Sequence, residues 1–91
     1  MALTPLVVDL SHHNTVNSFD AIAKWGIAGL IHKATQGTHF VDKTYAKRKG
    51  EAIRAGLLWG AYHFGDDTDP EDQVSHFLDT IKYDGKTLIA L

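Results

Sequence analysis

The sequence predicts an α/β fold in which parallel strands alternate with helices in the order βαβαβαβ. Four short apolar runs lie at residues 6–10, 28–34, 57–64 and 87–91. Segments with helical spacing of apolar residues separate them, and each of the first three runs ends in a polar loop. Strands connected in this way are parallel and joined by right-handed crossovers. Four such strands fit either an open sheet or half of a closed eight-stranded barrel.

The predicted strands are recognised by apolar, β-branched residues and by the turn-forming residues that bound them. The first strand leads into the loop Ser-His-His-Asn at 11–14, and the second leads into polar residues 35–38, which we expect to form a flexible connection. The third strand ends at the polar loop 65–68. A turn at Asp84-Gly85 precedes the fourth strand.

Two of the three predicted helices are bounded by short capping signals. The first is expected between a cap at Asn17 or Ser18 and a terminating glycine at Gly26. The second covers residues 43–55 and ends at Gly56.

The third helix carries the strongest signal, because its first residues suit the start of a helix. Asp69 can cap, Pro70 fits the first helical position, and the acidic residues at 71 and 72 favour the positive end of the helix dipole. A single apolar stripe predicts which side faces the core. It consists of Val74, Phe77, Leu78 and Ile81.

Composition restricts the class of protein. With 91 residues and 44% hydrophobic content, the chain predicts one compact domain over residues 1–91. Nine basic and eleven acidic side chains give a net charge of -2 with no basic stripe, which argues against nucleic acid as a partner. The absence of cysteine excludes disulfides, thiolate metal sites and thiol catalysis. No run is long enough to span a membrane, and residues 1–10 lack the pattern of an export signal.

Candidate functional residues lie where the strands end, because ligand sites of parallel α/β folds form at the carboxyl ends of the strands. Asp9 is a carboxylate in an otherwise apolar strand, and an unpaired buried charge costs several kcal/mol. It either serves the site or caps its own loop. Lys33 interrupts the second strand, where it either pairs with Asp9 or contacts substrate directly.

Aromatic and imidazole side chains supply further candidates. Tyr62 and Phe64 alternate on one face of the third strand and suit the apolar faces of sugar rings, whereas Trp59 on the other face is expected in the core. Six histidines raise the alternative of a metal-dependent hydrolase, but their spacing favours histidines that only form hydrogen bonds. No metal or other cofactor is therefore expected.

Three motifs occur in an order that resembles glycoside hydrolase family 25 muramidases. They are Val-Asp-Leu-Ser-His-His-Asn at 8–14, Ile-His-Lys-Ala-Thr-Gln-Gly-Thr at 31–38 and Gly-Ala-Tyr-His-Phe at 60–64. The resemblance implies an irregular TIM-like (β/α) barrel, of which residues 1–91 form the amino-terminal half, ending at strand four. It also implies hydrolysis of the β-1,4 bond between N-acetylmuramic acid and N-acetylglucosamine in peptidoglycan, outside the cell or at the cell wall.

The same resemblance assigns roles to residues. Asp9 matches the first-strand catalytic aspartate. Substrate-binding positions are Ser11, Lys33, Gln36, Tyr62 and Phe64. Many relatives have glutamate in place of Gln36, so this loop carries a neutral amide here. The family's Asp-x-Glu motif would follow Leu91, and we therefore expect the 91-residue chain alone to be inactive.

A second hypothesis assigns no catalysis to the chain. Exposed apolar edges on the first and fourth strands would recruit another strand, either from a second copy or from a missing carboxyl-terminal half. In this interpretation the chain is a half-barrel that self-associates or only binds cell-wall glycan.

Overall fold

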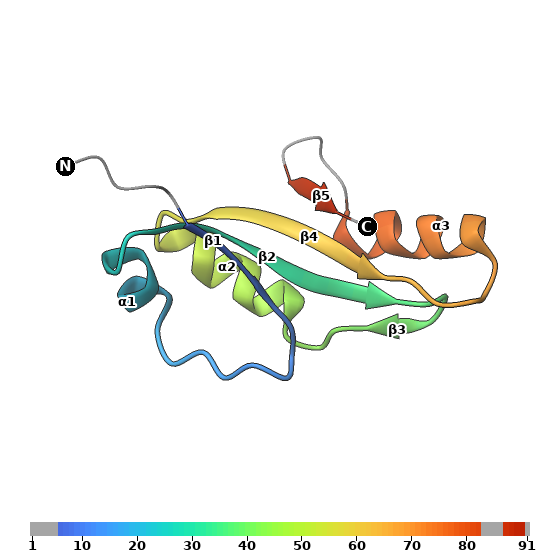
Figure 1. Ribbon diagram of the computed structural model, residues 1–91, viewed down its shortest axis with the longest axis horizontal. Helices are drawn as coiled ribbons and strands as arrows, with labels where there is room; N and C mark the ends of the chain where they lie inside the picture. The colour runs from blue at the N-terminus through green and yellow to red at the C-terminus, as the bar shows by residue number, and fades with distance from the viewer. Residues whose placement is uncertain (1–5, 83–86, 91) are drawn as a thin grey trace.

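The structure, a computed structural model, describes residues 6–82 and 87–90 and contains one sheet with helices packed against it (Figure 1). The strands are β1 (Leu6–Leu10), β2 (Ile27–Gln36), β3 (Phe40–Val41), β4 (Leu58–Phe64) and β5 (Leu88–Ala90). The helices are α1 (Phe19–Lys24), α2 (Tyr45–Arg54) and α3 (Pro70–Ile81). This arrangement confirms the predicted mixed α/β fold. The predicted turn at Asp84-Gly85 lies outside the described residues.

The sheet has the order β1-β2-β4-β5, and all three of these pairings are parallel. The register of β2 and β4 shifts between Lys33 and Thr35, so Lys33 is opposite Tyr62 and Thr35 is opposite His63. The extra residue at this irregularity turns Thr35 toward the same side as His63. The end of β2 therefore presents Lys33 on one face and Thr35 on the other.

The prediction of a flexible connection at residues 35–38 was wrong. The first two of these residues belong to β2, and the chain then reverses at Gly37, with φ of +58°, to return as the antiparallel strand β3. The Gly37 amide donates to the carbonyl of Phe64 at 3.1 Å, and the Asp42 amide donates to that of Ala34 at 2.8 Å. A strand of two residues is too short to show a periodic pattern, so β3 was not predicted.

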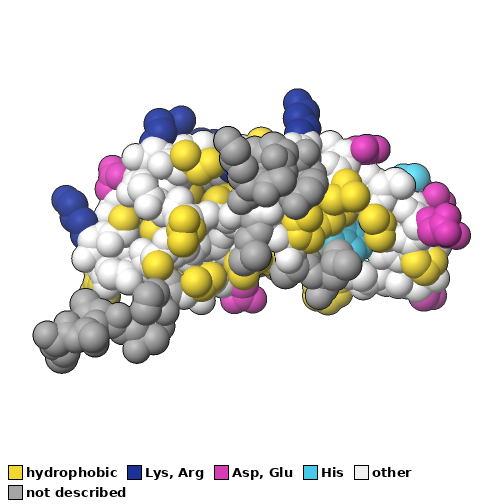
Figure 2. Space-filling model, turned by 90° about the horizontal axis from the view of Figure 1, so that it is seen from above, with side chains coloured by type: hydrophobic (Ala, Val, Ile, Leu, Met, Phe, Trp, Pro, Cys, Tyr) yellow, Lys and Arg dark blue, Asp and Glu magenta, His cyan; other side chains and the backbone are white. Residues whose placement is uncertain are grey.

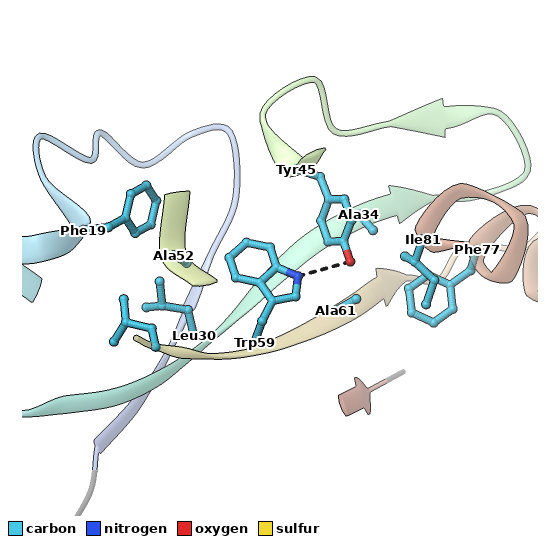
Figure 3. Packing of buried hydrophobic residues seen from close by; sticks show 10 residues of the cluster. Phe19, Leu30, Ala34, Tyr45, Ala52, Trp59, Ala61, Phe77 and Ile81 are labelled. Atoms are coloured by element: carbon cyan, nitrogen blue, oxygen red, sulfur yellow. Dashed lines mark hydrogen bonds between the residues drawn. The ribbon is translucent and has the colours of Figure 1, made fainter. Parts of the chain in front are cut away.

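All three helices cover one face of the sheet. Side chains of alternate residues in β2 and β4 point into this core, including Leu30 and Trp59, both buried. The Trp59 indole N–H donates to the Tyr45 hydroxyl at 3.2 Å, which ties β4 to α2 (Figure 3). Phe19 from α1 and Phe77 from α3 complete the core on either side. The core position expected for Trp59 is confirmed.

The helix starts agree with local sequence chemistry. Ser18, not Asn17, caps α1 by accepting from the Ala21 amide at 3.1 Å. Asp69 caps α3 by accepting from the Asp72 amide at 3.0 Å, with proline at the start of the helix. No helix within the described ranges is long and apolar enough to cross a membrane.

The apolar stripe of α3 is only half buried in the described part of the chain. Phe77 and Ile81 are buried, but Val74 is 45% exposed and Leu78 is 36% exposed. The predicted stripe therefore lies at the edge of the core, with only two of its four residues buried. The side of α3 that bears Phe77 and Ile81 packs into the core cluster, and its strand contacts are mainly with β2.

The opposite face of the sheet carries no helix among the described residues. Val7 and Leu58 are 55% and 72% exposed there, and Phe64 is 56% exposed. A view from above shows separate hydrophobic groups on the surface, with basic side chains along one edge and acidic ones gathered mainly at one end (Figure 2). We call the face of the sheet that is opposite the helices, and that bears Val7, Leu58 and Phe64, the open face. It bears the predicted site residues of the strands.

Candidate active site

The predicted site residues of the strands meet near the carboxyl ends of β1, β2 and β4. Asp9 in β1 lies opposite Ile31 in β2, two residues before Lys33. Lys33 lies opposite Tyr62, and Gln36 lies opposite Phe64. Since side chains alternate along a strand, Asp9 and Lys33 project from the open face. The strands thus place a carboxylate, an ammonium group, an amide and aromatic rings along one edge.

Lys33 occupies a cage built from the ends of three strands. Its ammonium nitrogen lies 4.8 Å from the centre of the Phe40 ring and 5.3 Å from that of Phe64, and it donates a hydrogen bond to the Gln36 side-chain oxygen. Only 6% of Lys33 is exposed, although both rings reach solvent. Lys33, Gln36 and Phe64 are therefore in direct contact, and Phe40 is a member of the cage that the sequence did not predict.

Asp9 and Tyr62 are coupled through charge. The Asp9 side chain is exposed, whereas Tyr62 is partly buried. Burial raises the pKa of the Tyr62 phenol, and the negative charges of Asp9 and Asp42 raise it further. The phenol therefore stays protonated at neutral pH and can donate a hydrogen bond beside a free carboxylate.

The proposed ion pair between Lys33 and Asp9 does not form. Among the described residues Lys47 forms an ion pair with Glu51, and His12 forms a hydrogen bond with Asp42, so neither Lys33 nor Asp9 has a charged partner. Gln36 and the aromatic rings take the place of a carboxylate around Lys33. Of the two alternatives for Lys33, direct contact with a ligand remains.

Ser11 lies in a loop held by its own hydrogen bonds and by α2. Its hydroxyl accepts from the His13 amide at 3.2 Å, and its amide donates to the Asn14 side-chain oxygen at 2.9 Å. The Arg48 guanidinium donates to the carbonyls of Ser11 and Asn14 at 2.9 and 2.7 Å. Within the described residues no contact joins Ser11 to the Lys33 cage, so Ser11 shapes the loop that follows Asp9.

A buried carboxylate ties this loop to the start of α2. Asp42 is 2% exposed and accepts from the amide and hydroxyl of Thr44 and from the amide and ring of His12. Burial alone would raise the pKa of Asp42, but the hydrogen bonds from Thr44 and His12 outweigh it and lower the pKa from 3.8 to about 2. Asp42 is therefore an anion at neutral pH, and its hydrogen bonds give it a structural role.

His32 completes this network in its neutral form. Its Nδ1 lies 2.8 Å from the Lys33 carbonyl and so carries the proton, while Nε2 accepts from Arg48 at 3.1 Å. Burial lowers the pKa of His32 from 6.5, with a smaller contribution in the same direction from the Arg48 charge. A protonated His32 would place a second donor against Arg48.

The two perturbed groups predict how stability depends on pH. Because the pKa of His32 is lowered by folding, the unfolded chain binds a proton first, and stability should fall as pH drops below about 6.5. The lowered pKa of Asp42 contributes stability in full above about pH 4, and this is lost as pH falls toward 2. Urea unfolding from pH 7.5 to 2.5 measures both steps. His32→Gln should remove the upper step alone, and an unchanged upper step in that variant would contradict the assignment.

His63 is held between two neutral partners. Its Nε2 donates to the Gln73 side-chain oxygen at 2.8 Å, and its Nδ1 accepts from the Thr35 hydroxyl at 2.7 Å. The Gln73 amide group donates in turn to the carbonyls of Asp66 and Thr68 at 3.2 and 2.9 Å. This chain of bonds shapes the loop between β4 and α3. The described residues contain no cluster of three or more metal-ligating side chains.

Residues far from the predicted strand ends therefore support the site. Asp42 and Arg48 hold the loop after β1, and Phe40 covers Lys33. The Asp-x-Thr spacing just before a helix is a local capping signal that could have identified Asp42. Nothing local marks Arg48, since it acts on a loop more than 30 residues earlier in the chain, or Phe40, since it reaches Lys33 only through the reversal of the chain between β2 and β3.

Known proteins provide an independent comparison. The sequence model of Glycosyl hydrolases family 25 matches residues 8–91. An autolytic lysozyme of Clostridium acetobutylicum is 36% identical over 63 residues, which are 69% of this chain and 19% of that protein. Lysozyme M1 of Streptomyces globisporus is 32% identical over 57 residues, or 63% of this chain and 19% of that protein. The chain thus spans about a fifth of the length of these relatives.

Solved structures show the same likeness. A family 25 glycosyl hydrolase from Bacillus anthracis matches 97% of this chain and 42% of its own, with a TM-score of 0.87 and 26% identity. A family GH25 lysozyme from Aspergillus fumigatus matches 78% of this chain and 35% of its own, with a TM-score of 0.72 and 36% identity. Because the family match covers nearly the whole chain, this protein belongs to glycosyl hydrolases family 25.

Proposed function

We propose that this chain forms the amino-terminal half of a peptidoglycan-degrading lysozyme domain. The domain acts outside the cell or at the cell wall and hydrolyses the β-1,4 bond between N-acetylmuramic acid and N-acetylglucosamine. Family membership and the lysozyme names of the relatives support this proposal. The open face also supports it. In an irregular (β/α) barrel, the strands that follow residue 91 would close the barrel and enclose this face of the sheet.

The observation that carries the proposal is the exposed carboxylate of Asp9, which lies on the same face of the sheet as Tyr62, with β2 between their two strands. Glycosidases place two carboxyl groups around the bond that they cleave. In this proposal the main pair belongs to an Asp-x-Glu motif after Leu91, and Asp9 is a further catalytic carboxylate of the same site. Asp42 cannot serve as a proton donor, since its pKa is about 2 and its oxygens are occupied by hydrogen bonds.

The substrate-binding surface in this proposal follows the same edge. The rings of Tyr62 and Phe64 contact the apolar faces of sugar rings, and Gln36 hydrogen-bonds to sugar hydroxyl or acetamido groups. Lys33 adds a positive charge, and Ser11 shapes the neighbouring loop. Because the main acidic pair comes from the Asp-x-Glu motif after Leu91, the 91-residue chain alone binds glycan without hydrolysing it at a lysozyme rate.

Replacing Asp9 tests the catalytic part of the proposal. In a protein that continues this chain through the rest of the barrel, Asp9→Asn should lower the release of reducing ends from purified peptidoglycan about 100-fold or more. Asp20→Asn is the matched control, because Asp20 is an exposed carboxylate on α1. Full activity of the Asp9 variant would rule out its catalytic role.

The 91-residue chain itself tests whether the Asp-x-Glu motif is required for hydrolysis. The 91-residue protein should bind peptidoglycan in a sedimentation assay and release no reducing ends above background. Hydrolysis by this chain at the rate of a complete family 25 lysozyme would show that the Asp-x-Glu motif is dispensable.

A second candidate function is self-association without catalysis. The open face has an apolar hollow of about 310 Å³ near the start of the strands, where the side chains of Val7 and Leu58 are exposed. Two copies that cover each other's open faces would remove this surface from water. Sedimentation equilibrium measures the mass in solution, and a stable monomer at about 100 μM would exclude this candidate.

A further inference from the structure

The cage around Lys33 contains a charge with no described counter-ion. Lys33 is 94% buried, since only 6% of it is exposed. The ion pairs among the described residues do not include it. Its partners are the neutral Gln36 oxygen and the faces of Phe40 and Phe64. Removing an ammonium group from water without a carboxylate costs several kcal/mol, and rings and an amide offset only part of that cost.

The position of this charge indicates where an anion would bind. The cage lies at the surface, because its two rings are partly exposed, Phe40 by 42% and Phe64 by 56%. An ammonium group has three N–H donors, of which Gln36 takes one. Asp9 lies on the same face of the neighbouring strand, but it forms no ion pair with Lys33. Two donors of the ammonium group therefore have no hydrogen-bond acceptor among the described residues.

We propose that Lys33 binds a carboxylate of the glycan ligand and makes this site selective for carboxylate-bearing glycans over neutral polymers of N-acetylglucosamine. The inference rests on the proposed function and names the substrate group that Lys33 recognises. In peptidoglycan a carboxylate comes from the lactyl group of a muramic acid that lacks its peptide or from the stem peptide itself. A charge-assisted bond in a desolvated cage is strong enough to discriminate between these glycans and chitin fragments.

The test is a calorimetric titration of the 91-residue chain with three tetrasaccharides. They are chitotetraose, an alternating N-acetylglucosamine and N-acetylmuramic acid tetrasaccharide without peptide, and the same tetrasaccharide with stem peptides. At least one acidic ligand should bind roughly tenfold more tightly than chitotetraose at low salt. Preference for the peptide-free tetrasaccharide identifies the lactyl carboxylate. Preference limited to the peptide-bearing ligand identifies a stem-peptide carboxylate.

Variants separate charge from packing. Lys33→Met should abolish the preference for acidic glycans, because methionine keeps the apolar volume of the cage but carries no charge. Lys33→Arg should keep the preference. Lys24→Met is the matched control, since Lys24 is an exposed lysine in the last turn of α1, before the start of β2. Urea unfolding of each variant confirms that it is folded.

The outcomes distinguish this inference from the proposed function. If all three glycans bind equally, or if Lys33→Met keeps the preference, the role of Lys33 is wrong and the proposed function stands. If no glycan binds, the proposed function falls and the role of Lys33 falls with it.

Discussion

Asp42→Ala is expected to lower the free energy of unfolding by about 3–5 kcal/mol. The substitution removes a buried carboxylate and leaves the amides of His12 and Thr44 without their acceptor. Each buried donor that loses its partner costs about 1–3 kcal/mol, and the pKa of about 2 shows how strongly folding favours the ionised form. The loop after β1 should also open in part, because Asp42 is one of its two links to α2, the other being Arg48.

Urea unfolding followed by tryptophan fluorescence measures the loss of stability, since Trp59 is buried in the core. Hydrogen exchange of the His12 amide measures the opening of the loop. Asp79→Ala is the matched control, because Asp79 is an exposed carboxylate on α3 and should change stability by less than about 0.5 kcal/mol. Equal effects of the two substitutions would show that Asp42 does not hold the loop.

Phe77→Ala should lower the free energy of unfolding by about 3–5 kcal/mol, because it leaves a cavity where α3 packs against the sheet. Phe77 is 1% exposed, and its ring centre lies 5.8 Å from that of His63. His63 in turn bonds to Gln73, which holds the carbonyls of the loop between β4 and α3. Loss of the ring should therefore loosen that loop as well as destabilise the fold.

Val74→Ala is the control on the same helix. Val74 is 45% exposed, so truncating it should cost less than about 1 kcal/mol. Denaturant unfolding compares the two variants, and the chemical shifts of the His63 ring report on its bonds. A loss for Phe77→Ala no larger than that for Val74→Ala would mean that α3 is not anchored through this ring.

Much of the fold could be predicted because its signals are local. The strand at residues 6–10 and the helix caps at Ser18 and Asp69 depend on residues within one turn or one run of each other. The reversal at Gly37 was not predicted. Its polar surroundings are typical of a loop, and the β3 pairing depends on contacts with β2 that the sequence pattern does not show.

The candidate site was predicted by residue type and strand position rather than by contact. Strand order brings Lys33, Gln36 and Phe64 together, as expected for residues at the ends of parallel strands. The pairing of Lys33 with Asp9 was wrong, because Gln36 takes one donor of the ammonium group and the aromatic rings enclose it. The roles of these residues in binding and catalysis stay predictions.

The sequence by itself determined the alternation of strands and helices, the family, and which residues stand at the strand ends, since these depend on short-range patterns and ordered motifs. Only the tertiary structure decided which partners the charged side chains have. Asp42 and Arg48 act on a loop about 30 residues earlier in the chain, and Phe40 reaches Lys33 by the reversal of β3. Hydrogen bonds and cation–π contacts act over a few ångströms, so their partners follow from the packing of distant segments rather than from spacing in the sequence.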